Sequence, residues 1–179
     1  MTPLIDSIDR LSELLGRSLA WLTWALVAVA VLVVVLRELF QIGSIALQES
    51  LSYLHSALFM LGAGYALKVG AHVRVDIFYQ RLSPRARAAI DLLGTLVFLL
   101  PFMAFLFWIS WDYVAVSWSL KERSSAAGGL PAVFLLKLLL LGLALTLGLQ
   151  GIAEALRNLA VLQGKRLPAP TAVEDEARL

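Results

Sequence analysis

SLAWLTWALVAVAVLVVVL, residues 18–36, decides the fold class of this chain. The stretch has 19 residues and carries no charged side chain. A helix that crosses the hydrocarbon core of a bilayer needs about 20 predominantly apolar residues, so this run predicts a transmembrane helix. The run is too long for the apolar region of a usual signal peptide, and residues of both charge signs precede it. We therefore interpret it as a helix that the protein retains.

Three further runs have the same character. Residues 50–67 contain His55 as their only ionisable group, residues 92–111 are uncharged, and residues 130–153 carry one charge, Lys137. The chain of 179 residues is 60% hydrophobic and 16% charged, whereas about a quarter of the residues in a soluble domain are charged. The sequence therefore predicts an all-α membrane protein with four transmembrane helices and short interfacial helices.

The basic side chains predict how these helices are oriented. Eleven of the 15 lysines and arginines fall before the first span, between the second and third spans, or after the fourth. Only Arg37, Lys121 and Arg123 fall in the links on the opposite side. Because cytoplasmic segments carry the excess of Lys and Arg, we expect both termini in the cytoplasm. Topology, membrane phospholipids or a partner then account for the basic segment 68–91, and we expect no nucleic-acid binding.

The same pattern predicts the order of the segments. An amphipathic pattern near the N-terminus indicates a helix on the cytoplasmic leaflet, and Ser83-Pro84 is typical of a helix start. The polar, proline-containing C-terminal segment is expected to be disordered. The predicted segments are an interfacial helix 1–17, a first span 18–39, an outer link 40–49, a second span 50–69, a basic cytoplasmic link 70–89, a third span 90–114, an outer loop 115–129, a fourth span 130–157 and a cytoplasmic tail 158–179.

Small residues and two others predict how the spans pack. Pro101, in the middle of the third span, predicts a kink. Gln150, near the inner end of the fourth span, predicts a hydrogen bond to another helix. Stripes of small residues predict close helix contacts in the second and fourth spans. The residues that form these stripes are Gly62, Ala66, Ala144, Gly148 and Gly151.

Two charged residues near the outer side leave alternatives open. Lys137 fits a structural role, in which it binds a lipid phosphate, carbonyl groups of a partner or a nearby carboxylate, and it also fits transport chemistry. Glu49 fits the first turn of a helix, where an acid complements the helix dipole. Glu49 equally fits an ion pair with Arg37 or with a basic residue of a partner.

Several functional classes lack support in the sequence. The chain has no cysteine, no glycine-rich phosphate loop and no pair of nucleophile and base, so we expect neither an enzyme nor a cofactor. His55 and His72 fall near opposite membrane edges, so they do not fit a shared haem iron. No span carries a carboxylate at its midplane, which a self-sufficient secondary transporter usually has. A self-assembling four-helix transporter or channel remains the alternative to a helper subunit.

The segment GAHVRVDIFYQRLSPRARAAIDLLG, residues 70–94, lies between Glu49 and the later motifs KERS and GGLP. With these motifs, residues 15–157 resemble the small membrane subunit, of DctQ type, of tripartite ATP-independent periplasmic (TRAP) transporters. LHSALFMLGAGY and GGLPAVFLLK, residues 54–65 and 128–137, look similar to the branch associated with mannitol or chloroaromatic compounds.

The resemblance implies a four-helix scaffold subunit in the bacterial inner membrane. In such a transporter a large elevator-type membrane subunit holds the substrate and sodium sites, and a periplasmic substrate-binding protein delivers an organic acid. The sodium gradient drives import. The resemblance implies no catalytic, cofactor-binding or metal-binding residue in this subunit. It implies contacts with partner subunits or lipids at the recurring motif positions Arg37, Glu49, His72, Arg74, Asp76, Glu122 and Lys137.

Overall fold

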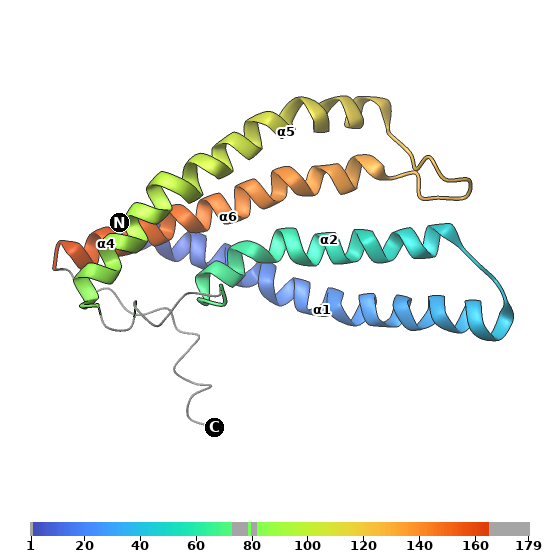
Figure 1. The fold of residues 1–179 in the computed structure, drawn as a ribbon, viewed down its shortest axis with the longest axis horizontal. Helices are drawn as coiled ribbons and strands as arrows, with labels where there is room; N and C mark the ends of the chain where they lie inside the picture. Colours follow the sequence, from blue (N-terminus) through green and yellow to red (C-terminus); the bar gives the residue numbers. More distant parts are fainter. Residues whose placement is uncertain (1, 73–78, 80–81, 165–179) are drawn as a thin grey trace, which may run out of the picture.

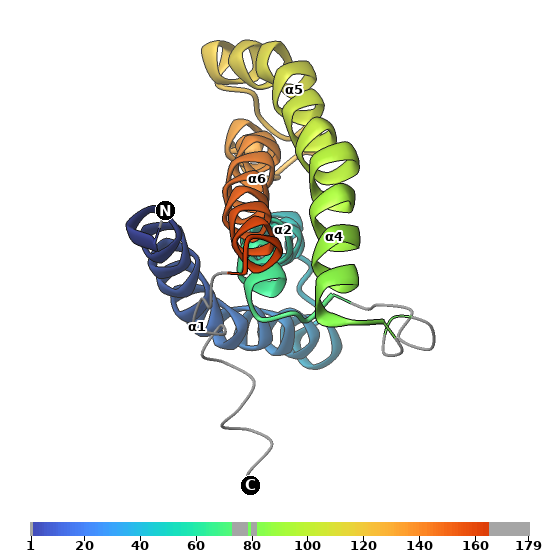
Figure 2. The same ribbon diagram turned by 90° about the vertical axis from the view of Figure 1, so that its left-hand side faces the viewer.

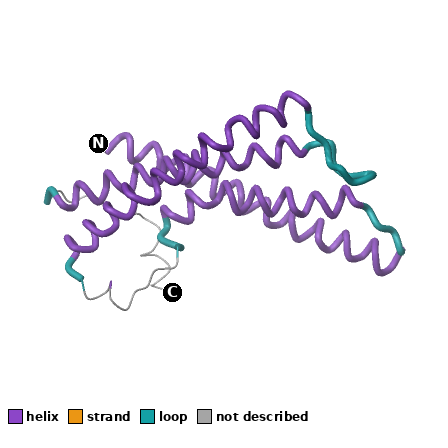
Figure 3. The backbone as a smooth tube through the Cα atoms, turned by 45° about the horizontal axis from the view of Figure 1, so that its top comes forward, coloured by secondary structure: helices purple, strands orange, loops and turns teal. Residues whose placement is uncertain are grey.

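The computed structural model of the chain describes residues 2–72, 79 and 82–164. All regular structure in these residues is helical (Figure 3), which agrees with the predicted all-α class. The helices are α1 (Thr2–Phe40), α2 (Ile45–Lys68), α4 (Pro84–Gly94), the π-helical segment η1 (Thr95–Leu99), α5 (Leu100–Leu120) and α6 (Val133–Leu162).

The helices run up and down as antiparallel rods around α6 (Figure 1). Helix α2 packs between α1 and α6, while α4, η1 and α5 pack on another side of α6. Figure 2, viewed along the rods, shows α1 and α4 on opposite sides of the α2 and α6 pair. The chain begins and α6 ends at one end of the bundle, which we call the terminal end. The opposite end holds residues 41–44 and 121–132, and we call it the loop end.

Three helical stretches are long and apolar enough to cross a membrane: Pro3–Phe40, Pro84–Leu120 and Val133–Leu162. The protein is therefore membrane-embedded. Helix α2 has 24 residues, or about 36 Å at roughly 1.5 Å per residue, so its length matches a bilayer core. It is not among the three stretches, because serines, glycines, Glu49 and His55 interrupt its apolar residues. The sequence predicted α2 as the second of four spans.

Helix α1 runs without a break across the boundary that the sequence suggested between 1–17 and 18–39. Glu13 and Arg17 form an ion pair one turn apart, which stabilises the last helical turn before this boundary. Ile5 and Ile8 are buried and pack with Ala153 of α6. Part of the apolar face of the first turns therefore covers α6, and the helix has no reason to break before its apolar run.

The third apolar run also belongs to a longer helix, which extends from Pro84 to Leu120 and so beyond both ends of the predicted span 90–114. The predicted start at Ser83-Pro84 is confirmed, because the Ser83 hydroxyl accepts a hydrogen bond of 3.3 Å from the Ala86 amide. Pro101 has no N–H to donate to the preceding turn. Just before it, the Leu100 amide bonds to the Thr95 carbonyl, five residues back, in the π-helical segment. The sequence predicted a kink at Pro101, and the structure shows a π-helical segment directly before it.

Glycines set the closest helix contacts. A Cβ atom on Gly64 of α2 would lie 2.8 Å from the Thr146 carbonyl oxygen of α6, so only glycine fits this spacing. A Cβ on Gly151 of α6 would lie 2.9 Å from Leu99 Cδ2. Gly62, which the sequence placed in a packing stripe, has more room, since its nearest neighbour is Leu19 at 3.8 Å. The close approach of helices that the small residues predicted is therefore present in this chain.

Helix α2 ends at Lys68, and Gly70 follows in the left-handed conformation with φ of +68°. Such a conformation costs glycine little, and it stops the helix before the basic link. Arg74 and Asp76 of that link, and residues 165–179 of the predicted tail, lie outside the described residues. Residues 158–162, which the sequence assigned to the tail, instead form the last turns of α6.

Candidate functional site

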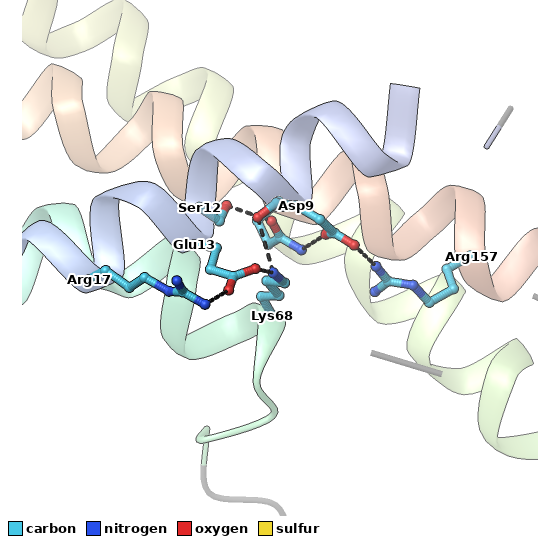
Figure 4. A network of polar contacts seen from close by, with 7 residues as sticks. Asp9, Ser12, Glu13, Arg17, Lys68 and Arg157 are labelled. Atoms are coloured by element: carbon cyan, nitrogen blue, oxygen red, sulfur yellow. Dashed lines mark hydrogen bonds and ion pairs between the residues drawn. The ribbon is translucent and has the colours of Figure 1, made fainter. Parts of the chain in front are cut away.

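A group of polar and charged side chains joins α1, α2 and α6 at the terminal end (Figure 4). We call it the terminal-end cluster. Its members come from positions far apart in the sequence, and the antiparallel order of the helices brings them together. They are Asp9, Ser12, Glu13, Arg17, Lys68, Gln150 and Arg157.

Gln150 lies at the centre of the terminal-end cluster, and its side chain is fully buried. Its Oε1 accepts a hydrogen bond of 2.7 Å from the Ser12 hydroxyl, and its Nε2 donates one of 3.0 Å to Asp9 Oδ1. The hydrogen bond to another helix that the sequence predicted for Gln150 is therefore confirmed. A buried amide with both ends bonded fixes the rotation and register of α1 against α6.

Two basic side chains complete the cluster. Arg157 Nη2 lies 2.8 Å from Asp9 Oδ2. Lys68 Nζ donates bonds of 3.1 Å to the Asp9 carbonyl oxygen and to Glu13 Oε2. The side chains of Lys68 and Arg157 are only 8% and 11% exposed, and charges so deeply buried require partners. The cluster thus joins three helices through paired charges.

The sequence interpretation assigned Lys68 to topology and did not foresee this cluster. Beside Gln150, the available signal was the spacing of Asp9 and Glu13, which puts two acids on one face of a helix. The partners of Asp9 lie 141 and 148 residues away along the chain. No local periodicity reports pairing over such separations.

At the loop end, Glu49 holds the connection between α5 and α6. One carboxylate oxygen accepts a hydrogen bond from the Ser124 hydroxyl, and Oε2 accepts one of 2.6 Å from the Leu130 amide. The Ser124 hydroxyl and then the Leu130 amide lower the pKa of Glu49, because both bond to its charged form. A Cβ on Gly129 would lie 2.6 Å from Ser124 Cβ, so the close packing inside this loop favours glycine.

The ion pair considered between Glu49 and Arg37 is not what the structure shows. Arg37 Nε lies 2.9 Å from Glu38 Oε1, and both side chains are largely exposed. A neighbouring acid at the surface contributes little stability, so Arg37 stays accessible to other groups.

Lys137 pairs with Glu122 across the same connection. Its Nζ lies 2.5 Å from Glu122 Oε2 and 3.9 Å from the centre of the Tyr113 ring. The hydrogen bond from Lys137 is the largest cause of the lowered pKa of Glu122. Of the partners that the sequence left open for Lys137, the structure shows the nearby carboxylate.

The predicted contact residues therefore divide into three groups. Glu49, Glu122 and Lys137 bond within the chain at the loop end. Arg37 is exposed at that end, and His72 is exposed just beyond α2. Arg74 and Asp76 lie outside the described residues. Contacts of these residues with partner subunits or lipids remain a prediction.

The outer surfaces of α1 and α5 are apolar. Trp21 and Trp24 of α1 are 77% and 72% exposed, and Phe98 of η1 and Trp108 of α5 are 73% and 79% exposed. Surfaces of this kind fit lipid tails or another membrane protein. The charged groups described above tie helices to one another, so the arrangement supports a rigid membrane body that presents apolar outer faces.

Comparison with known families agrees with this arrangement. The family model for tripartite ATP-independent periplasmic transporters, DctQ component, matches residues 26–161, which is more than half of the chain. No curated protein and no solved structure matched the chain.

Proposed function

The chain belongs to the DctQ family, the small membrane subunits of TRAP transporters, and from this membership we propose that it is the scaffold subunit of a sodium-driven importer of an organic acid. This is a family of transporter subunits and not of enzymes. Its proposed partners are a large membrane subunit, which would hold the sodium and substrate sites, and a periplasmic substrate-binding protein. Phospholipids surround the assembled complex.

The observation that carries this proposal, beside the family match, is how the chain uses its buried charges. Lys68, Arg157 and Lys137 all pair with carboxylates of the same chain, at one end of the bundle or the other. Charged groups that bind a transported substrate or ion usually lie near the midplane of the bilayer, whereas these pairs lie towards the two ends of the bundle. Internal pairing supports a body that stabilises a transporter rather than one that moves substrate itself.

We further propose four membrane spans, with α2 as the fourth in addition to the three apolar stretches. Helix α2 lies between α1 and α6, and its length is sufficient to cross a bilayer core. Its neighbours on two sides cover part of its surface, while Ser52 and His55 stay exposed. Gly64 and Lys68 of α2 are buried in these contacts.

The orientation that we propose places the terminal end in the cytoplasm of a bacterium and the loop end in the periplasm. Basic residues gather at the terminal end, and few occur at the loop end, which supports this orientation. The described basic residues at the terminal end are Arg10, Arg17, Lys68, Arg85, Arg87 and Arg157.

The family match does not indicate which organic acid is transported. The family match covers the DctQ component as a whole and identifies no branch within it, so it gives no support to the mannitol or chloroaromatic branch. In the proposed division of labour, the binding protein and the large subunit select the substrate.

A pull-down tests the proposal directly. The tagged chain would be extracted from its native membranes in mild detergent, and the co-purifying proteins would be identified by mass spectrometry. We expect a large polytopic membrane protein in a stoichiometric amount. Recovery of this chain only, as a homo-oligomer, would contradict the scaffold role and favour a small self-assembling transporter.

A further inference from the structure

Helix α5 has one face against α6 and one face without a neighbour among the described helices. Met103, Ser110, Val114 and Ser117 are buried against the rest of the bundle. Asp112 lies two residues after Ser110, which turns it about 200° around the helix axis, to the opposite side. Its side chain is exposed there.

Apolar side chains surround Asp112 on this outer face. We call the set the Asp112 face, and it consists of Phe105, Trp108, Ile109, Asp112 and Val116. The four apolar members are between 53% and 79% exposed. The face is thus a broad aromatic and aliphatic surface with one carboxylate near its centre.

Asp112 is the only charged residue between Leu92 and Leu120. It lies eight residues before the end of α5, or about 12 Å at roughly 1.5 Å per residue. The third span is expected to end at residue 114, so Asp112 lies near the membrane edge, where its short side chain reaches less far towards water than that of a lysine. A carboxylate in such a place is costly unless a cation or a hydrogen-bond donor meets it.

The structure gives Asp112 no hydrogen bond and no ion pair with any described residue. One cation to consider is Lys137, which contacts the ring of the adjacent Tyr113. Lys137 pairs with Glu122 and not with Asp112. Lys137 is thus neutralised within the chain, and Asp112 is left for a group from outside it.

The outer face of α1 differs from the Asp112 face because it carries no charge. It is also broad and apolar, with Trp24, Val27 and Val31 exposed, but it carries no charged residue from Ser18 to Leu36. Lipid tails satisfy such a surface fully. They offer nothing to a carboxylate, so the two faces fit different neighbours.

We propose that the Asp112 face of α5 is the docking surface for the large membrane subunit, and that Asp112 pairs with a lysine or arginine of that subunit. The proposal rests on the proposed function and adds which surface meets the partner. The matching surface would be an apolar helix face with a basic side chain near the same membrane edge. Trp108 suits such a contact, because tryptophan often dominates binding energy and also attracts cations.

Site-specific crosslinking tests which helix face contacts the large subunit. The chain has no native cysteine, so the label reacts only with the introduced one. Ile109→Cys and Val31→Cys would each be labelled with a benzophenone maleimide in membranes that contain all subunits. After illumination, we expect Ile109→Cys to crosslink to the large subunit. We expect Val31→Cys, on α1, to give no crosslink to that protein.

A charge reversal tests the role of Asp112 itself. Asp112→Arg should lower the recovered large subunit about tenfold or more, because it sets two cations against each other in a desolvated contact. Asp112→Asn should reduce recovery less. The matched control is Asp6→Arg, at an exposed acid of α1 that lies at the terminal end, and it should leave recovery unchanged. The yield of monodisperse chain shows whether each variant folds.

The outcomes separate the failure of this inference from that of the proposed function. A crosslink from Val31→Cys but not from Ile109→Cys, with the complex intact, would overturn the inference alone. The same holds if Ile109→Cys labels only phospholipid in an intact complex, or if Asp112→Arg leaves recovery unchanged. If the unsubstituted chain recovers no large subunit at all, the proposed function fails and this inference fails with it.

Discussion

At the scale of single residues, Gln150 shows how one side chain can hold two helices. Both ends of its buried amide bond to α1. Gln150→Leu would keep the volume but leave Ser12 and Asp9 without these bonds. Since unsatisfied buried polar groups are costly, we expect a loss of about 1–3 kcal/mol in unfolding free energy. Thermal unfolding in detergent, followed by circular dichroism, would measure it.

The control for this change lies just after the end of the same helix. Gln163 follows α6 and is exposed, so Gln163→Leu should change the unfolding temperature little. Equal losses from the two substitutions would show that the bonds of Gln150 contribute nothing measurable.

Lys137 separates a scaffold role from transport chemistry. Lys137→Ala removes the cation that faces Glu122 and contacts Tyr113. If Lys137 only stabilises the loop end, complex recovery and uptake should fall modestly, by about two- to fivefold, which is the effect of roughly 0.5–1 kcal/mol. Lys137→Arg, which keeps the charge, should lose less. Complete loss of sodium coupling in an intact complex would contradict the scaffold role.

The loop end should be sensitive to acid. The folded state lowers the pKa values of Glu49 and Glu122 below the ordinary value of 4.5. An acid whose pKa is lowered on folding stabilises the folded state fully at pH values above its ordinary pKa. This stabilisation is lost as the pH falls through the pKa of the folded state. We therefore expect amide-exchange protection of Leu130, corrected for intrinsic rates, to be constant near neutrality and to decrease below about pH 4.5.

Glu49→Gln provides the comparison for this pH dependence. A glutamine keeps one acceptor oxygen, but its amide nitrogen does not accept the hydrogen bond from the Leu130 N–H. The Leu130 amide should thus be less protected at neutral pH in this variant, and its protection should change less between neutral and acidic solution. An unchanged pH profile would assign the acid sensitivity to other groups.

At the scale of elements, local patterns predicted what is local. Apolar runs located α1, α5 and α6, and Ser83-Pro84 located the start of α4. The bonds of Asp9 and the contact of Gly64 were not predictable in this way. Each depends on how a helix is rotated against a distant neighbour, and one sequence carries no local signal of that rotation. Gly62 and Ala66 indicated close packing in α2, while of the two glycines in α2 it is Gly64 that makes the tight contact.

A pair of glycine substitutions in α2 tests this packing. Gly64→Ala would place its Cβ 2.8 Å from the Thr146 carbonyl oxygen, so α2 and α6 must separate. We expect it to destabilise the protein by about 1–3 kcal/mol. Gly62→Ala meets only Leu19 at 3.8 Å, so the better helix propensity of alanine should leave stability equal or higher by up to about 1 kcal/mol. Thermal unfolding of both variants gives the comparison, and a tolerant Gly64 would contradict the tight contact of α2 and α6.

At the scale of the whole molecule, polar bonds lock both ends of the bundle. The terminal-end cluster joins α1, α2 and α6, while Glu49 ties α2 to the connection of α5 with α6. Between these ends the outer surfaces are apolar. A body built in this way resists relative sliding of its helices, and that rigidity is what a scaffold beside a moving subunit requires.

Such a body has one orientation in the membrane, which single cysteines would reveal. Ser125 lies exposed in the loop between α5 and α6, and Gln163 lies exposed just after α6. In spheroplasts that carry Ser125→Cys or Gln163→Cys, a membrane-impermeant maleimide should label the first variant at once. It should label the second only after lysis, because the basic terminal end is expected in the cytoplasm. The absence of native cysteines removes background. Labelling of Gln163→Cys in intact spheroplasts would contradict this prediction. It would mean either that the orientation is opposite to the proposed one or that α2 does not cross the membrane.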